Sequence, residues 1–144
     1  MIEKEIEAIF AGQDIGDGDV DIDGVLAAFK RLRAGATKAD LPLLVTALQS
    51  PRNNFWTREL FADPVSRLGG VDYLEPLLQA LRRGSEDGHD NDGLCTYLAD
   101  IAEADSDQCR KKLEQLLARA DFHYGNEAKW LLGFCKTGRP DETA

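Results

Sequence analysis

Two short acidic segments contain the side chains best suited to chemistry. In the first, Asp19, Asp21 and Asp23 alternate with apolar residues and are followed by Gly24. Alternating carboxylates with a glycine at the turn are typical of the opening of a calcium-binding loop. The position that would need a bidentate glutamate is Lys30. We therefore expect no calcium site. Asp21 or Asp23 instead caps a helix, and the other acids are either solvated or form a patch for a basic partner.

The second segment is Gly88-His89-Asp90-Asn91-Asp92-Gly93. Its His-Asp dipeptide resembles the motif after which a class of metal-dependent phosphohydrolases is named. Those enzymes need another histidine upstream, whereas the other histidine of this chain, His123, lies downstream. We expect Asn91 or Asp92 to cap a helix and the glycines to make turns. The alternative is a surface recognition loop.

The sequence has no other signature of catalysis or of cofactor binding. It lacks a glycine-rich phosphate loop, a nucleophile motif and a set of four metal ligands. Cys95, Cys109 and Cys135 are far apart and lie among apolar residues, so we interpret them as reduced core thiols. The sequence thus predicts a protein that is not an enzyme and that needs neither metal nor cofactor.

The charge of the chain is concentrated at one end. The 144 residues carry a formal net charge of −9, of which residues 1–24 contribute −7. This field repels nucleic acid and anionic membranes and accelerates encounter with basic proteins, although acidity also serves solubility. The chain contains no apolar run of about 18 residues, and acids interrupt its N-terminal segment. We therefore expect a single cytoplasmic domain with no membrane or direct nucleic-acid partner.

Apolar residues recur at helical spacing along the chain, which predicts an all-α fold. Residues 1–36 should form a helical pair. Further on, leucine-rich helices are expected over 40–49, 73–83 and 107–119, each followed by a second amphipathic helix. The second leucine of each Leu-Leu pair, at Leu44, Leu78 and Leu117, marks intervals of 34 and 39 residues. Such a period is typical of stacked helical repeats. The expected caps of the first helices are Asp40, Asp72 and Ser106.

This pattern, with an early proline in two of the leucine-rich helices (Pro42 and Pro76), resembles HEAT-like and armadillo-like bacterial repeat proteins. The resemblance covers residues 37–137. It implies a HEAT-like α-solenoid of three helical hairpins, capped by the N-terminal helical pair and followed by a flexible tail over residues 138–144.

Aromatic residues near the loops are candidate contact residues. We expect Phe122 and Trp130 to pack in the core or within their helical hairpin, and Tyr124, Lys129 and His123 to face solvent. Combined with the acids, the residues expected to bind a partner are Asp14, Asp17, Asp19, Asp21, Asp23, Phe55, Trp56, Asp90, Asp92, Tyr97 and Tyr124.

The leading hypothesis is a non-catalytic protein-binding module. By analogy with polymorphic toxin and contact-dependent inhibition systems, it would be an immunity protein that neutralises a cognate, basic bacterial toxin. The alternative is a scaffold or adaptor that docks a peptide or an enzyme subunit on its concave face. A third hypothesis is a lyase-like chaperone for a cofactor-bearing partner.

Overall fold

The computed structural model describes residues 2–13, 20–88 and 90–135, and every regular element in this part of the chain is helical. The expectation of an all-α fold is confirmed. Short 3-10 turns, η2 (Lys38–Asp40) and η3 (Gly70–Tyr73), precede α3 and α5. The helices are α1 (Ile2–Gln13), α2 (Ile22–Gly35), α3 (Leu41–Leu48), α4 (Phe55–Gly69), α5 (Leu74–Glu86), α6 (Asp92–Ala104), α7 (Ser106–Ala118) and α8 (Gly125–Leu132).

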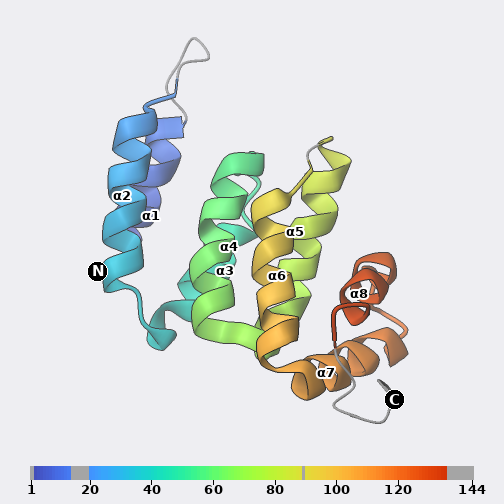
Figure 1. Cartoon of the computed structure of the whole chain (residues 1–144). Coiled ribbons are helices and arrows are strands. Elements are labelled where there is room, and N and C mark those ends of the chain that lie inside the picture. Colours follow the sequence, from blue (N-terminus) through green and yellow to red (C-terminus); the bar gives the residue numbers. More distant parts are fainter. Residues whose placement is uncertain (1, 14–19, 89, 136–144) are drawn as a thin grey trace.

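Consecutive helices pack as pairs: α1 with α2, α3 with α4, α5 with α6, and α7 with α8. In Figure 1, α2, α4 and α6 form the front layer, and α1, α3 and α5 lie behind them. Neighbouring pairs also contact each other, since α4 packs against α6 and α3 against α5. The stack thus has one layer of first helices and one of second helices.

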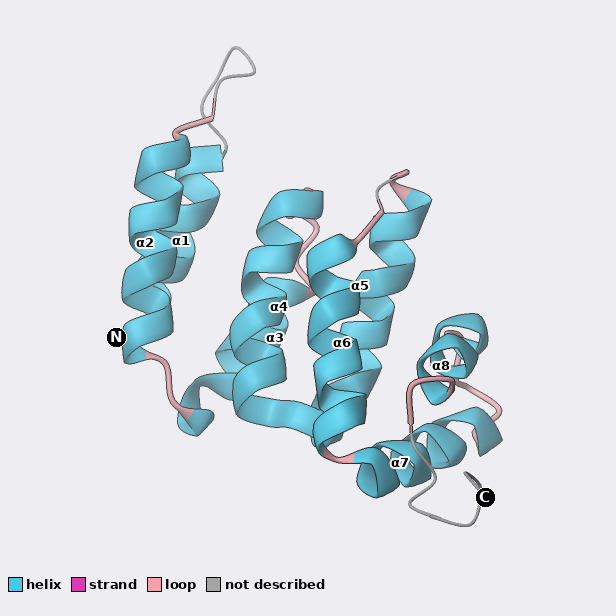
Figure 2. Cartoon of the chain, in the orientation of Figure 1, coloured by secondary structure: helices cyan, strands magenta, loops and turns pink. Residues whose placement is uncertain are grey.

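The last pair departs from this arrangement. Figure 2 shows α7 crossing the lower end of α5 and α6 at a steep angle. A regular stack of repeats would make the three leucine-rich first helices parallel, and α7 does not follow that arrangement. The reason is the link from α6 to α7, which consists of Asp105 alone. A single residue does not let the chain reverse direction, whereas the four residues of η3 separate α4 from α5.

The leucine-rich helices bury one stripe each. Leu44 and Leu78 are fully buried, as the repeat predicts. In α7 the prediction was wrong by one position, because Leu116 is buried and Leu117 is half-buried. Cys109, buried on the same face of α7, is one of the expected core thiols. Burial, and then the neighbouring thiol of Cys135, raise its pKa to about 12.

The predicted caps of the first helices are wrong. No side-chain cap bond is present at the start of α3, α5 or α7. Asp40 instead accepts a hydrogen bond from the amide of Thr37, 2.9 Å away, and so serves the preceding 3-10 turn. Ser106 is already inside α7, where its hydroxyl donates to the carbonyl of Ala102. Continuous helical turns at these junctions leave little need for the predicted caps.

Arginine–carboxylate ion pairs link successive helical pairs. Three of them are bidentate, which fixes orientation as well as distance: Arg52–Glu7, Arg82–Glu127 and Arg119–Glu75. The shortest N–O distances are 3.0 Å for Arg33–Asp63, 3.1 Å for Arg58–Asp87, 2.8 Å for Arg82–Glu127 and 2.9 Å for Arg119–Glu75.

Two adjacent leucines of α3 test the packing. Leu44 is fully buried and Leu43 is 39% exposed. Leu44→Ala should lower the free energy of unfolding by about 2–5 kcal/mol, because it leaves a cavity in the core. Leu43→Ala in the same helix is the matched control and should cost well under half as much. Urea denaturation followed by circular dichroism measures both, and equal losses would contradict the described register of α3.

Candidate functional site

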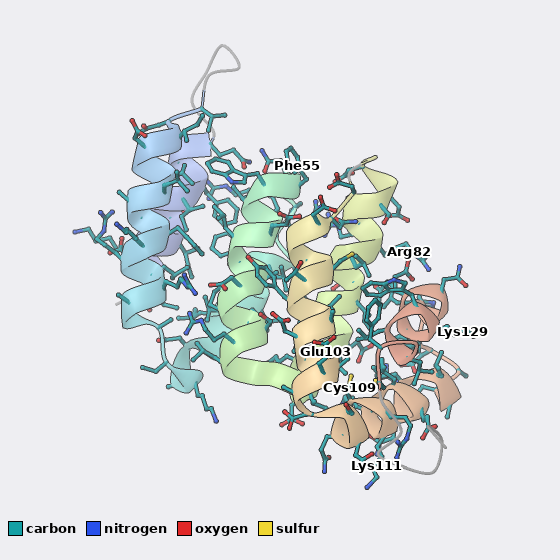
Figure 3. All side chains as sticks on the ribbon, viewed as in Figure 1. Phe55, Arg82, Glu103, Cys109, Lys111 and Lys129 are labelled. Atoms are coloured by element: carbon teal, nitrogen blue, oxygen red, sulfur yellow. The ribbon has the colours of Figure 1, made fainter. Side chains whose placement is uncertain are left out.

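One edge of the molecule collects the N-termini of three helices. Helices α2, α4 and α6 run in the same direction, so their first turns lie at the upper edge in Figure 1. In Figure 3, Phe55 marks the start of α4 at this edge. We call this region the acidic edge and define it by Asp21, Asp23, Phe55, Glu59, Asp90 and Asp92.

At the start of α2, the two acids have different roles. Asp21 caps the helix, since its Oδ1 accepts a hydrogen bond from the amide of Gly24 at 3.0 Å. A Cβ on Gly24 would lie 2.1 Å from the other carboxylate oxygen, so the cap requires glycine there. Asp23 lies in the exposed first turn. The expectation that one of these acids caps the helix is confirmed for Asp21.

The start of α4 positions the two predicted aromatic residues. The side chain of Asn54 accepts from the amide of Thr57 at 2.9 Å, and the hydroxyl of Thr57 accepts from the amide of Asn54 at 3.1 Å. This reciprocal cap fixes the first turn of α4. Phe55 is 41% exposed, whereas Trp56 is half-buried and packs against the core. Of the two, Phe55 is the better placed for contact with a partner.

Glu59 is a residue of the edge that no sequence pattern indicates. It lies against the first turn of α6, where a Cβ on Gly93 would approach its Oε1 to 2.8 Å. Burial raises the pKa of Glu59, hydrogen bonds from the amides of Leu94 and Gly93 oppose the rise, and the negative charges of Asp90 and Asp92 add to it. Residues close to Glu59 in the sequence give no sign of this role, because the groups that it contacts in space, Gly93 and Leu94, belong to α6.

The loop before α6 aims its two acids outward. Asn91, between them, is buried in a left-handed conformation with φ of 60°. Its side-chain amide donates to the carbonyl of Leu81 at 3.3 Å and to the hydroxyl of Ser85 at 3.2 Å. Asp90 and Asp92 are exposed on either side. Asn91 occupies the cap position of α6 without a side-chain cap bond and instead anchors the loop.

Several carboxylates of the edge have no cation beside them. Asp87 pairs with Arg58 at 3.1 Å, but within the described residues no ion pair involves Asp23, Asp90 or Asp92. Asp23 and Asp92 lie in the first turns of α2 and α6, where a helix dipole favours negative charge. The edge therefore presents carboxylates that make no ion pair among the described residues, and it also carries the exposed ring of Phe55.

The other predicted contact residues lie elsewhere. Tyr97 is further along α6 and lines a cleft of about 500 Å³, together with Arg33, Asp63 and Arg67. Tyr124 precedes α8, with the guanidinium of Arg82 5.7 Å from its ring centre. The structure does not bring either residue to the acidic edge. The predicted contacts Asp14, Asp17 and Asp19 lie outside the described residues.

Tyr124, expected to face solvent, is half-buried. Trp130 does not pack in the core, although core packing is one of the two arrangements expected for it. Its side chain is 37% exposed and stacks edge-to-face with Phe134, 5.0 Å between ring centres. Leu131, the next residue of α8, is the one that is buried. Phe122 is half-buried, while His123 and Lys129 are exposed as expected.

The described residues contain no group of three histidine, cysteine or acidic side chains that could hold a metal ion. Two residues of the candidate metal motifs, Asp19 and His89, lie outside that part of the chain. No described helix has the length and apolar character needed to cross a membrane.

Comparison of the chain with protein-family models, with curated proteins and with solved structures gives no match. Function is therefore inferred from the residues of this chain.

The pKa of Glu59 provides a test of the edge. Its pKa is raised above the ordinary value of 4.5, so folding takes up a proton and ionisation costs stability as pH rises through that range. Glu59→Gln removes the charge while keeping an oxygen acceptor for the amides. The free energy of unfolding of this variant relative to the wild type should therefore increase as pH rises above 4.5 and then level off.

Urea denaturation between about pH 4 and pH 8 measures the difference, since this interval spans the ordinary range of carboxylate titration and its upward shift. Glu114→Gln, at an exposed position of α7, is the matched control and should show no such rise. If the free energy of unfolding of Glu59→Gln relative to the wild type instead falls with increasing pH, the folded protein favours the ionised carboxylate of Glu59.

Proposed function

We propose that this protein is a non-catalytic binding module that docks a basic protein on its acidic edge. The observation that carries the proposal is that the starts of α2, α4 and α6 lie at one edge, which carries the exposed ring of Phe55 and three carboxylates, Asp23, Asp90 and Asp92, that make no ion pair among the described residues. An apolar contact flanked by complementary charge is the usual composition of a protein interface.

The sign of the charge favours protein over other partners. A surface that binds nucleic acid neutralises phosphates with lysine and arginine, and the exposed groups of this edge have the opposite sign. The carboxylates also project from three separate helices rather than converging on one point. A basic protein surface satisfies spread carboxylates better than a single ion does.

Within this class, we propose that the protein acts in the cytoplasm as an immunity protein. Its acidic edge would cover a positively charged toxin surface that normally receives phosphate. The net charge of −9 and the exposed acids at the starts of α2 and α6 support this role. We also propose, from the repeated leucine pattern, that the protein is related to HEAT-like repeat proteins.

The cleft beside Tyr97 favours a second candidate function, an adaptor that docks a peptide. The cleft lies on the side of the second helices α4 and α6 and presents both arginine and aspartate side chains. A partner held there would lose affinity on substitution of Tyr97. It would be little affected by substitutions at the acidic edge.

Co-purification and binding kinetics test the proposal. The partner is captured from the native cell, identified, and its association rate is measured at several salt concentrations. Asp23→Asn, Asp90→Asn and Asp92→Asn combined should slow association by about three- to tenfold at low salt, with a smaller effect on dissociation. The effect should fade as salt reaches 0.1 M and above, where charges are screened beyond about 10 Å.

The matched control is the triple variant Asp72→Asn, Glu103→Gln and Glu114→Gln, which changes net charge equally at exposed positions outside the edge. It should alter the association rate less than twofold by the same electrostatic reasoning. A toxic partner should also stop cell growth when co-expressed with the edge variant and not with the control. An acidic partner, or equal effects of the two triple variants, would refute docking on the acidic edge.

A further inference from the structure

Helix α2 carries an apolar stripe that remains open to solvent. Ile22, Leu26, Phe29 and Arg33 follow one another at helical spacing and therefore share one side of the helix. Ile22 is 56% exposed and Leu26 44%, while Phe29 is half-buried against the core. Arg33 reaches Asp63 of α4 at 3.0 Å, which places this side of α2 toward α4. We call Ile22, Leu26 and Phe29 the α2 stripe.

The α2 stripe lacks the helical neighbour that the next helix in its layer has. Helix α4 packs directly along α6, but no comparable packing joins α2 to α4 within the described residues. Side chains connect the two pairs instead: Arg33 with Asp63, and Phe10 of α1 with Phe61 of α4, whose ring centres are 5.2 Å apart. Ile22 and Leu26 thus remain uncovered at the end of α2 that belongs to the acidic edge.

The charge along α2 indicates what covers the stripe. Asp21 and Asp23 stand at its first turn, beside Ile22. Further along, Arg33 is paired with Asp63, and Lys30 is exposed. A partner that buries Ile22 therefore meets negative charge next to the apolar contact. A second copy of this chain is a poorer occupant, because each copy carries a net charge of −9 and the two repel.

We propose that the α2 stripe docks an amphipathic helix of the partner protein, with leucine-like side chains on Ile22 and Leu26 and basic side chains beside Asp21 and Asp23. Apolar residues three and four positions apart on such a helix match the spacing of the stripe. The inference rests on the proposed function and adds the mode of contact. The carboxylates provide charge complementarity to the partner helix. The α2 stripe provides the apolar area that is buried on binding.

A synthetic peptide tests this directly on the full chain. The probe is a peptide of about 18 residues, spanning about 27 Å as a helix, with leucine at helical spacing and lysine on the opposite side. Calorimetry gives its dissociation constant, and amide chemical shifts locate its site. We expect shifts along α2 and at the acidic edge, and at least about a tenfold loss of affinity in Ile22→Ser combined with Leu26→Ser.

The control for apolar exposure is Leu43→Ser combined with Phe134→Ser, which removes two exposed apolar side chains from other elements and should leave affinity unchanged. Since Ile22 and Leu26 are exposed, their variant should keep the wild-type melting temperature, which circular dichroism verifies. A second peptide with the same lysines and a scrambled leucine pattern should bind more weakly.

The outcomes separate the two proposals. If the Ile22/Leu26 variant binds the peptide as tightly as the wild type, the stripe is not the docking face, although a basic partner on the acidic edge still stands. If a peptide with glutamate in place of each lysine binds equally well, charge complementarity is refuted both for the acidic edge and for the α2 stripe. If sedimentation shows a wild-type dimer that the Ile22/Leu26 variant abolishes, a second copy covers the stripe and the inference is wrong.

Discussion

The fold depends on one constraint, which is that a pair of antiparallel helices does not bury its own apolar face. Each pair must therefore be covered by the next one. Fully buried side chains such as Leu44, Leu78 and Leu98 follow from this requirement in successive pairs. Arginine–carboxylate ion pairs at the junctions add orientation, with Arg82 and Glu127 in a bidentate contact between the third and fourth pairs. Apolar burial provides the driving force, and the ion pairs select among the ways of stacking.

The acidic edge follows from the direction of the second helices. Helices α2, α4 and α6 run in the same direction, so their first turns lie at one side of the molecule. Carboxylates are favoured at helix N-termini because they accept from unpaired amides and interact with the helix dipole. A residue such as Asp21 therefore serves the helix, while Asp23, two residues later, caps nothing and is exposed. In the proposed function, capping and recognition thus use the same residue type two positions apart.

The junction between the first two pairs differs from the others. Side chains such as Phe10 and Phe61 connect them, without helix-to-helix packing of α2 along α4. This leaves Ile22 and Leu26 exposed beside the acidic edge. Burying them in a complex would release water from apolar surface, whereas the carboxylates nearby would mainly direct the encounter. Affinity and association rate would then depend on different residues of the same surface.

By itself, the sequence determined the helices, most of their buried faces and the acidic character of one end, because a period of 3.6 residues and helix-capping chemistry are local properties. It named Phe55, Asp90 and Asp92 as contact residues, which stays a prediction; Phe55 and Asp92 open α4 and α6, and Asp90 lies in the loop before α6. Only the tertiary structure decided which of two adjacent leucines in α7 is buried, since a one-residue rotation leaves the local pattern intact. It alone also placed Glu59 against α6 and turned α7 across the stack, because such contacts depend on packing between segments distant in sequence.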